Sequence, residues 1–561
     1  MIGGFRQSMT WLHTWSGLVM CWVLYFMFVT GTLGYFDTEI DLWMTPELPY
    51  QLDEQPFEQT LANITMAQQR LMELAPDAQR WFISPEPWRE SPRLKVGWVP
   101  LPAEDGTRGT FSEAILDPTT GQVLTARETG GGQLLYRMHY LLHYLPGRSG
   151  YWIATIATML MFIGLVTGIV AHKKIFADFF TFRWGRGQRS WLDAHNLLSV
   201  ATLPFQLMIT YSGLLFTLGL FWMPFVVLGG YGFDVQRVAG LQAELAGREP
   251  ILRADEPGRL LPLAELARQG TQDWSDKTVS LVFVENPGDA NATVSIQAPG
   301  VGRDRPTVQY MGVSGELVSE GGLELPNASA RFALASIDLH EGIFAGAFLR
   351  WLYFLAGVMG TGMIATGAIY WVEARRKKDP DAQYSRGHRF VRNMNVGTIV
   401  GLLIAIGAYF WSNRLLSVDM PGREQWEVHS MFLVWLGCFV HASLRPYARA
   451  WIEQLYVLAA VFLMLPLVNA LTTELHLLNT LASGSWVLAG FDLVALLVGM
   501  IALTVARHLG QRELRQKSAA IPEPLAEKRA EAPLEHSSDL PPLPNAQVSQ
   551  VRVSQVQVSQ A

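Results

Sequence analysis

Charged residues are scarce in this chain of 561 residues. Asp, Glu, Lys and Arg make up 16% of it, whereas half of the residues are hydrophobic. Such a balance argues against a large soluble enzyme and is typical of an integral membrane protein. The formal net charge of −6 is thinly spread, so the sequence predicts no nucleic-acid partner.

Cysteine is almost absent. Cys21 and Cys438 both lie in apolar stretches, which excludes a disulfide framework and a thiolate metal cluster. The sequence also lacks a Cys-x-x-Cys-His motif for covalent haem attachment and shows no flavin or nicotinamide site. The run Gly130-Gly131-Gly132 precedes no Rossmann helix, and we interpret it as a linker.

Long apolar segments dominate what is present. A membrane-spanning helix needs about 20 apolar residues, and eight segments qualify: Trp15–Phe36, Tyr151–Ala171, 196–233, Trp351–Val372, Asn395–Trp411, Val428–Leu444, Gln454–Leu471 and Ser485–Ala506. The 196–233 segment is too long for one crossing. We expect its helix to end near Leu218 and an interfacial stretch with Trp222 to follow. The first segment lacks a small-residue cleavage site, so it is predicted to be an anchor.

Basic residues predict the orientation. Lys and Arg gather in the loops 173–192 and 374–394 and after the sixth and eighth apolar segments. Because cytoplasmic loops carry the excess of Lys and Arg, we expect a multi-pass protein of the bacterial inner membrane with both termini in the cytoplasm. The long insertions 37–150 and 234–345 then lie on the periplasmic side.

Each insertion is predicted to be a small α+β module. The first combines a helix over 61–74 with strands near 93–99, 110–116 and 122–125; the second has a helix over 261–268 and strands near 278–284, 293–297, 307–311 and 316–318. The expected fold class is a membrane all-α helical bundle of about eight transmembrane helices with two periplasmic α+β modules. Residues 395–507 form a four-helix extension, and 516–561 are expected to be a disordered cytoplasmic tail.

The first four helices contain an internal duplication of the unit helix, module, helix. His13 opens the first helix and His195 the third, and eighteen residues after each comes a glycine that follows a hydroxyl residue, at Gly31 and Gly213. The second and fourth helices repeat this theme: His143 precedes Thr167-Gly168 by 25 residues to the glycine, and His340 precedes Thr366-Gly367 by 27.

Parallel repeats place equivalent residues at the same membrane depth. His13 is therefore expected level with His195 near the inner face, and His143 with His340 near the outer face. Two neutral imidazoles, one on each side of the iron, are what a six-coordinate b-type haem requires. The sequence thus predicts two haem sites, with the glycines allowing the flat macrocycle to approach the helix backbone.

Two further histidines leave alternatives open. His139 lies one helical turn before His143, so both can face the same way. His172 ends the second helix at the depth of the inner pair and is the substitute ligand there. A single histidine at a helix end is more often an ordinary interfacial residue, but recurrence at matched depths in both repeats favours ligation.

Four motifs carry a family resemblance. "WLHTWSGL", "LHYL", "TGIVAHKKIFADFFTFR" and "SWLDAHNLLSV", spread over about residues 1–375, resemble the PepSY-associated transmembrane-helix family. Members of that family include inner-membrane ferric-siderophore reductases with two b haems between four helices and PepSY-like outer modules. The resemblance implies a haem-dependent oxidoreductase that passes electrons from a cytoplasmic donor or quinol to a periplasmic ferric siderophore or chelate.

The chemistry is consistent with this interpretation. Reduction of Fe(III) loosens a chelate because Fe(II) is a poorer match to hard oxygen ligands, and haem iron transfers single electrons. An aromatic acceptor surface over the outer haem is one interpretation of five aromatic residues, and module core plus interfacial belt is the other; they are Trp81, Trp88, Trp98, Trp222 and Tyr231.

Two other functions fit the sequence. One is a membrane scaffold or regulator whose modules bind a partner and whose histidines only satisfy helix ends. The other is a transporter, since parallel repeats and Asp492 within the eighth helix are compatible with transport. In the extension, His429 and His441 lie twelve residues apart and so at different depths, and we interpret them as structural.

Overall fold

The computed structural model describes residues 4–519 apart from short gaps. Outside the described part lie residues 1–3, 52–54, 86–88, 90, 104–106, 108, 147, 173–174, 176–178, 180, 231–250, 300–305, 321–327, 379–384 and 520–561. The predicted tail therefore falls almost wholly outside it, and its first residues, up to Ala519, continue the last helix.

Apolar helices form most of the chain. They are α1 (Phe5–Gly34), α5 (Ser149–Ala171), α7 (Gln188–Ala201), α8 (Leu203–Gly230), α12 (Ala347–Lys378), α13 (Arg386–Ile399), α14 (Gly401–Leu415), α15 (Arg423–Leu444), α16 (Tyr447–Thr472) and α18 (Trp486–Ala519). Among the described residues, seven helices are long and apolar enough to cross a membrane, or eight when the bent pair α7 and α8 counts as one span. Each of the eight predicted segments overlaps one of these spans, which confirms a multi-pass membrane protein.

The third span is broken in the middle. Helices α7 and α8 meet at Thr202 with a bend of 70°, whereas its counterpart α1 runs unbroken over 30 residues. Pro204 explains the break, because proline lacks a backbone N–H and its ring clashes with the preceding turn, so it favours the first turn of a new helix. The prediction that the helix ends near Leu218 is wrong, since α8 continues to Gly230.

Both insertions contribute to a single antiparallel sheet. Its strands are β1 (Ala78–Ser84), β2 (Lys95–Pro100), β3 (Ser112–Leu116), β4 (Val123–Leu124), β5 (Leu281–Glu285), β6 (Thr293–Gln297), β7 (Thr307–Met311) and β8 (Leu317–Glu320), in the order β4-β3-β2-β1-β5-β6-β7-β8. The expectation of two separate modules is therefore corrected. Strand β1, which the sequence analysis missed, pairs with β5 and sets Phe82 opposite Phe283.

The joined sheet has one core. Helices α3 (Phe57–Leu74) and α10 (Leu263–Gly270) pack against each other, and their apolar faces bury Ile64 and Leu266 together with Val282 and Val284 of β5. Pairing of β1 with β5 removes an exposed strand edge from each half. The two insertions are therefore joined by backbone hydrogen bonds as well as by a shared core.

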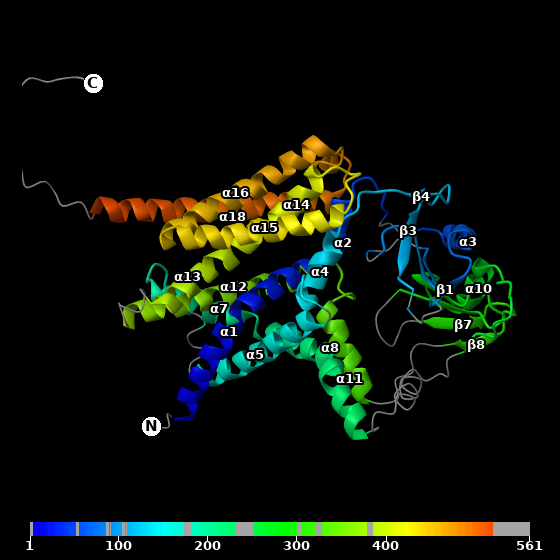
Figure 1. Ribbon diagram of the computed structural model, residues 1–561, viewed down its shortest axis with the longest axis horizontal. Helices are drawn as coiled ribbons and strands as arrows, with labels where there is room; N and C mark the ends of the chain where they lie inside the picture. Colours follow the sequence, from blue (N-terminus) through cyan, green and yellow to red (C-terminus); the bar gives the residue numbers. More distant parts are fainter. Residues whose placement is uncertain are drawn as a thin grey trace, which may run out of the picture. The chain divides into compact units, whose positions relative to one another are not determined.

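Short helices connect the sheet to the spans (Figure 1). They are α2 (Asp37–Met44), α4 (Gly131–Leu141) and α11 (Ala328–Glu341), and α17 (Leu477–Ala482) lies in the extension. The run Gly130-Gly131-Gly132 begins α4, so its interpretation as a linker is wrong. Helix α4 packs against α1 and α2, and α11 packs against α8.

A candidate site of two imidazole pairs

The first imidazole pair joins α1 and α7. The ring centroids of His13 and His195 are 6.2 Å apart, and the ring planes are inclined by 65°. Nδ1 of His13 lies 2.8 Å from the carbonyl oxygen of Gly164, and Nδ1 of His195 lies 2.8 Å from that of Met363. A carbonyl only accepts, so Nδ1 carries the proton in both rings and the Nε2 lone pair is left for a ligand.

The second imidazole pair joins α4 and α11. The ring centroids of His139 and His340 are again 6.2 Å apart, with an interplanar angle of 48°. Nδ1 of His139 lies 2.7 Å from the carbonyl oxygen of Met27. Nδ1 of His340 lies 2.8 Å from Oγ of Ser212, and the backbone of Ile209 also hydrogen-bonds this ring. Each pair therefore takes one histidine from each copy of the repeat.

All four rings lie against a glycine of a neighbouring helix. A Cβ atom at that glycine would come within 2.5–3.3 Å of the ring, at Gly168 for His13, Gly367 for His195, Gly31 for His139 and Gly213 for His340. In each case the backbone group that binds the imidazole belongs to the residue four positions before the glycine. The glycines were predicted to make room for a macrocycle; in the structure they make room for the imidazoles.

The hydroxyl residue before each of the four glycines makes the same hydrogen bond within its own helix. Each hydroxyl donates to the carbonyl oxygen four residues earlier in its own helix: Thr30 to Phe26 at 2.8 Å, Thr167 to Ile163 at 2.6 Å, Ser212 to Met208 at 2.6 Å and Thr366 to Gly362 at 2.7 Å. Such back-bonding satisfies a hydroxyl inside an apolar helix. The repeated unit is therefore a hydroxyl residue, a glycine and an imidazole from the next helix.

His143 does not take part in the second pair. The backbone takes up positive φ values at Leu142 (49°) and Tyr144 (69°), so α4 ends at Leu141 and His143 leaves the line of the helix. Its ring stacks instead on Phe432 of α15 at 5.8 Å. The structure thus does not bring His143, the predicted partner, to His340. The alternative, His139, lies beside His340 because it is still within α4.

His172 lies beside the first pair without joining it. It follows the last residue of α5, and its Nε2 lies 3.0 Å from the side-chain nitrogen of Asn196, the residue after His195. Of the three inner candidates, the structure brings together His13 and His195, the pair that the symmetry of the repeat predicts.

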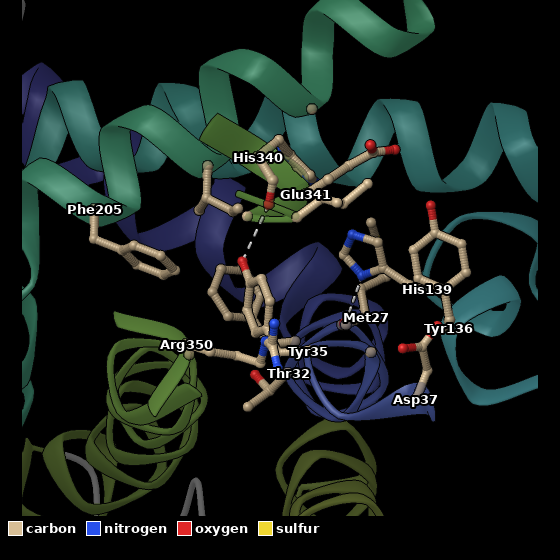
Figure 2. A pocket seen from close by; sticks show the side chains of 18 of the residues that line it. Met27, Thr32, Tyr35, Asp37, Tyr136, His139, Phe205, His340, Glu341 and Arg350 are labelled. Atoms are coloured by element: carbon tan, nitrogen blue, oxygen red, sulfur yellow. Dashed lines mark hydrogen bonds between the residues drawn. The ribbon is translucent and has the colours of Figure 1, made fainter. Parts of the chain in front are cut away.

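A cavity of about 270 Å³ lies beside the second pair (Figure 2). His139 and His340 both line it, and its apolar wall includes Met27, Phe205 and Ile209. Polar groups line it as well, among them Tyr136, Gln133, Arg89 and Arg350. The cavity therefore brings together two imidazoles, apolar side chains and charged groups of both signs, since Asp37 and Glu341 also line it.

Burial keeps the second pair uncharged. Desolvation, together with the neighbouring His139, lowers the pKa of His340 to about 3. Burial also lowers the pKa of His139. Both imidazoles are therefore neutral at physiological pH, which is the form that binds a metal.

The two pairs lie near opposite ends of α1. His13 belongs to the first pair, and Gly31, against which His139 packs, follows eighteen residues later. At 1.5 Å per residue this separation is roughly 27 Å along the helix, close to the thickness of a bilayer's hydrocarbon core.

Of the five aromatic residues considered as an acceptor surface, two belong to the sheet core and the side chains of the other three lie outside the described residues. Trp81 is buried in the sheet core, where its indole nitrogen donates to the carbonyl oxygen of Ala75, and Trp98 packs against the same core. Trp88, Tyr231 and the side chain of Trp222 lie outside the described residues. The core interpretation therefore holds for Trp81 and Trp98.

Polar residues of the extension have protein partners. His441 lies 2.9 Å from Glu453, and Tyr144 hydrogen-bonds His429. The carboxylate of Asp492 accepts from the Trp43 indole at 3.1 Å and from Asn469 at 3.1 Å. These contacts agree with the structural interpretation of these residues.

The described residues contain no group of three or more His, Cys, Asp or Glu side chains placed to hold a metal ion. The imidazoles with a free Nε2 instead come in facing twos. Such an arrangement suits a cofactor that supplies the equatorial ligands of its own metal and takes only two axial ligands from the protein.

The chain was compared with known proteins. No curated protein matches it. A family model described as "PepSY-associated TM region" matches residues 10–374, which include both imidazole pairs, both insertions and the first four spans. The chain therefore belongs to the PepSY-associated TM region family.

Proposed function

We propose that this protein is a haem-dependent electron-transfer protein of a bacterial inner membrane, with one b-type haem between His13 and His195 and another between His139 and His340. The observation that carries the proposal is the fourfold use of one arrangement, in which an imidazole binds backbone or hydroxyl oxygen through Nδ1 and faces a second imidazole with Nε2 free. Histidines that hold haem or metals are oriented by this kind of hydrogen bond.

The spacing of the rings supports the proposal. An iron atom at ~2 Å from one nitrogen of each of two opposed imidazoles places the ring centroids roughly 6 Å apart. The centroid distance is 6.2 Å in both pairs. The same value in two pairs built from different helices is what two equivalent axial ligand sets require.

The cavity of the second pair is lined by two arginines, Arg89 and Arg350, and by two acidic residues, Asp37 and Glu341. The arginines are the groups in it that suit the two anionic propionates of haem. Arg350 donates to the carbonyl oxygen of Ala345. Arg89 donates to both carboxylate oxygens of Glu39. We expect these two guanidinium groups to lie nearest the propionates, since Arg binds carboxylates in a bidentate manner.

The protein's part in the reaction is to hold, shield and space the two sites. Bound haem supplies one-electron exchange between Fe(III) and Fe(II). Burial lowers the pKa of His139 and of His340, which keeps both imidazoles of the second pair neutral. The two sites lie near opposite ends of α1, so one haem would be held toward each membrane face, with electrons entering at one site and leaving at the other. We propose a cytoplasmic donor or quinol as the source of electrons and a periplasmic ferric siderophore or chelate as the acceptor.

The test is the haem content of the purified protein in detergent. Wild type should show a Soret band, b-type peaks after reduction and two haems per chain. His139→Ala with His340→Ala should retain one haem, and so should His13→Ala with His195→Ala. The matched controls His143→Ala and His172→Ala should retain two. A colourless wild-type protein would contradict the proposal and favour a scaffold. Substrate accumulation in vesicles without a redox partner would instead indicate a transporter.

Reoxidation tests the acceptor. Protein reduced with dithionite should be reoxidised by ferric chelates, and the rate should fall at least tenfold in the His139→Ala, His340→Ala variant. Equal rates in this variant and in wild type would show that electrons do not leave through the second pair.

A further inference from the structure

The four-helix extension lies outside the family match, which ends at residue 374, and it contributes no member of either imidazole pair. We infer that its helices α14 and α15 act as a clamp on the segment Arg127–Gly131 and thereby position His139 for its cofactor. This inference rests on the proposed function and assigns the extension a positioning role in it.

Three hydrogen bonds connect α14 and α15 to the start of α4. The Tyr409 hydroxyl donates to the carbonyl oxygen of Gly131 at 3.0 Å. The Thr129 hydroxyl donates to the Glu427 carboxylate at 2.6 Å and accepts from the Asn413 amide at 3.2 Å. Tyr409, Asn413 and Glu427 are fully buried, so water offers these groups no alternative partner.

Two arginines complete the clamp. Nη1 of Arg127 donates to the carbonyl oxygen of Asn413 at 2.6 Å, and Nη1 of Arg423 donates to that of Glu128 at 2.8 Å. Arg423 also pairs with Glu427, and neither side chain is exposed to solvent. The chain from Arg127 to Gly131 is thus held at four of its five residues by groups of α14 and α15.

Burial of this network has a large desolvation cost. A buried ion pair pays a desolvation cost that its Coulomb attraction does not always offset, and ionisable groups in a membrane segment are costly and tend to be functional. Here Asn413, Arg423 and Glu427 bond one another and also bond atoms of one short segment, Arg127–Gly131. That choice of partners points to placement of α4 rather than to general packing of the extension.

The opposite side of the same segment is held by α2. The Asp41 carboxylate accepts from the backbone N–H of Gly132 at 2.7 Å. Gly131 has a φ of +58°, and a Cβ atom there would lie 1.7 Å from the Asp41 oxygen. Only glycine fits at this position, and the start of α4 is fixed between α2 on one side and the clamp on the other.

A displacement of the first residues of α4 also moves the imidazole of His139. His139 comes eight residues after Gly131, about 12 Å along a helix of only eleven residues. Its ring already lies so close to Gly31 that a Cβ atom there would be 2.5 Å from Nδ1. The ring lines the cavity on one side and contacts Gly31 on another. We expect a tilt of α4 to break the bond from His139 to Met27 or to turn Nε2 away from His340.

The test compares two substitutions at Thr129 in the full chain. Thr129→Val removes all three hydrogen bonds of the hydroxyl, to Glu427, from Asn413 and from the backbone N–H of Gly131, at similar volume. Thr129→Ser retains them. We expect Thr129→Val, alone or with Glu427→Gln, to halve the haem of the second pair or reduce it further, with the low-spin EPR signal of the first pair unchanged. Thr129→Ser should be like wild type. The control Gln454→Met removes a buried hydrogen bond of the extension that does not touch α4 and should leave both haems.

A readout without haem keeps the two hypotheses apart. In haem-free protein, carbethoxylation of His139 by diethyl pyrocarbonate should be at least fivefold faster in Thr129→Val than in wild type, while that of His13 is unchanged. Absence of haem from wild type would overturn the proposed function alone. Unchanged haem and unchanged His139 reactivity in Thr129→Val, or equal loss of both haems in it, would overturn the clamp.

Discussion

At the scale of single residues, the account depends on glycines that leave room for imidazoles. Gly31→Val places a branched side chain where a Cβ atom alone would lie 2.5 Å from His139 Nδ1. We expect loss of one haem of two, measured as pyridine haemochrome per chain. The control is Gly17→Val in the same helix, where a Cβ atom meets nothing within 4 Å and two haems should remain. Retention of both haems by Gly31→Val would show that the ring position is not critical.

The sequence was sufficient to find these residue types but not to pair all of them. His13 and His195 each precede their glycine by eighteen residues, and the structure brings them together. His143 precedes Gly168 by 25 residues and His139 precedes it by 29, while His340 precedes Gly367 by 27. The spacing is therefore midway between the two candidates, and only the end of α4 at Leu141 decides for His139.

At the scale of elements, burial of Asp41 at the start of α4 predicts a pH dependence. Burial raises the pKa of Asp41 from 3.8 to about 7. Between these values the folded protein holds a proton that the unfolded chain has lost, so this residue lowers stability as pH rises from about 4 to about 7, by up to ~1.4 kcal/mol per pH unit. Asp41→Asn keeps an oxygen for the Gly132 N–H and should flatten that decline.

The measurement is the apparent melting temperature in detergent from pH 4 to pH 7. Wild type should lose more stability than Asp41→Asn over this range, and the two should differ most near pH 7. Parallel curves for the two proteins would mean that Asp41 ionises normally and that its burial does not affect stability.

The pairing of β1 with β5 makes a second prediction for an element. Residues directly opposite in an antiparallel pair have Cα atoms about 4.5–5.5 Å apart, within the range of a disulfide. Phe82→Cys with Phe283→Cys should therefore form an intrachain crosslink on mild oxidation, detected as a linked peptide by mass spectrometry. Phe82→Cys with Val294→Cys, on β1 and β6, is the control and should not crosslink. Equal yields in both would contradict the joined sheet.

Local sequence patterns could not reveal that β1 pairs with β5. Alternation and turn signals identified seven of the eight strands near their observed positions, because those signals are local. The union of β1 with β5 joins residues about 200 positions apart, and nothing in either strand alone specifies its partner. The short helix α4 was missed for a related reason, since its start is fixed by Asp41 and by Tyr409, far away in the chain.

At the scale of the whole molecule, apolar runs predicted the spans because the bilayer imposes a length on each of them. All eight predicted segments overlap the observed candidate spans. The role of the extension was not predictable in this way. Its buried contacts with Arg127–Gly131 connect residues nearly 300 positions apart, and only the folded chain brings them together.

The most direct test of the central claim is the EPR spectrum of the oxidised, purified protein at low temperature. The account predicts two low-spin ferric signals typical of bis-imidazole haem, of which His340→Ala removes one and His195→Ala the other, while His143→Ala removes neither. A spectrum without low-spin haem, or one in which His143→Ala abolishes a signal that His139→Ala leaves intact, would contradict it.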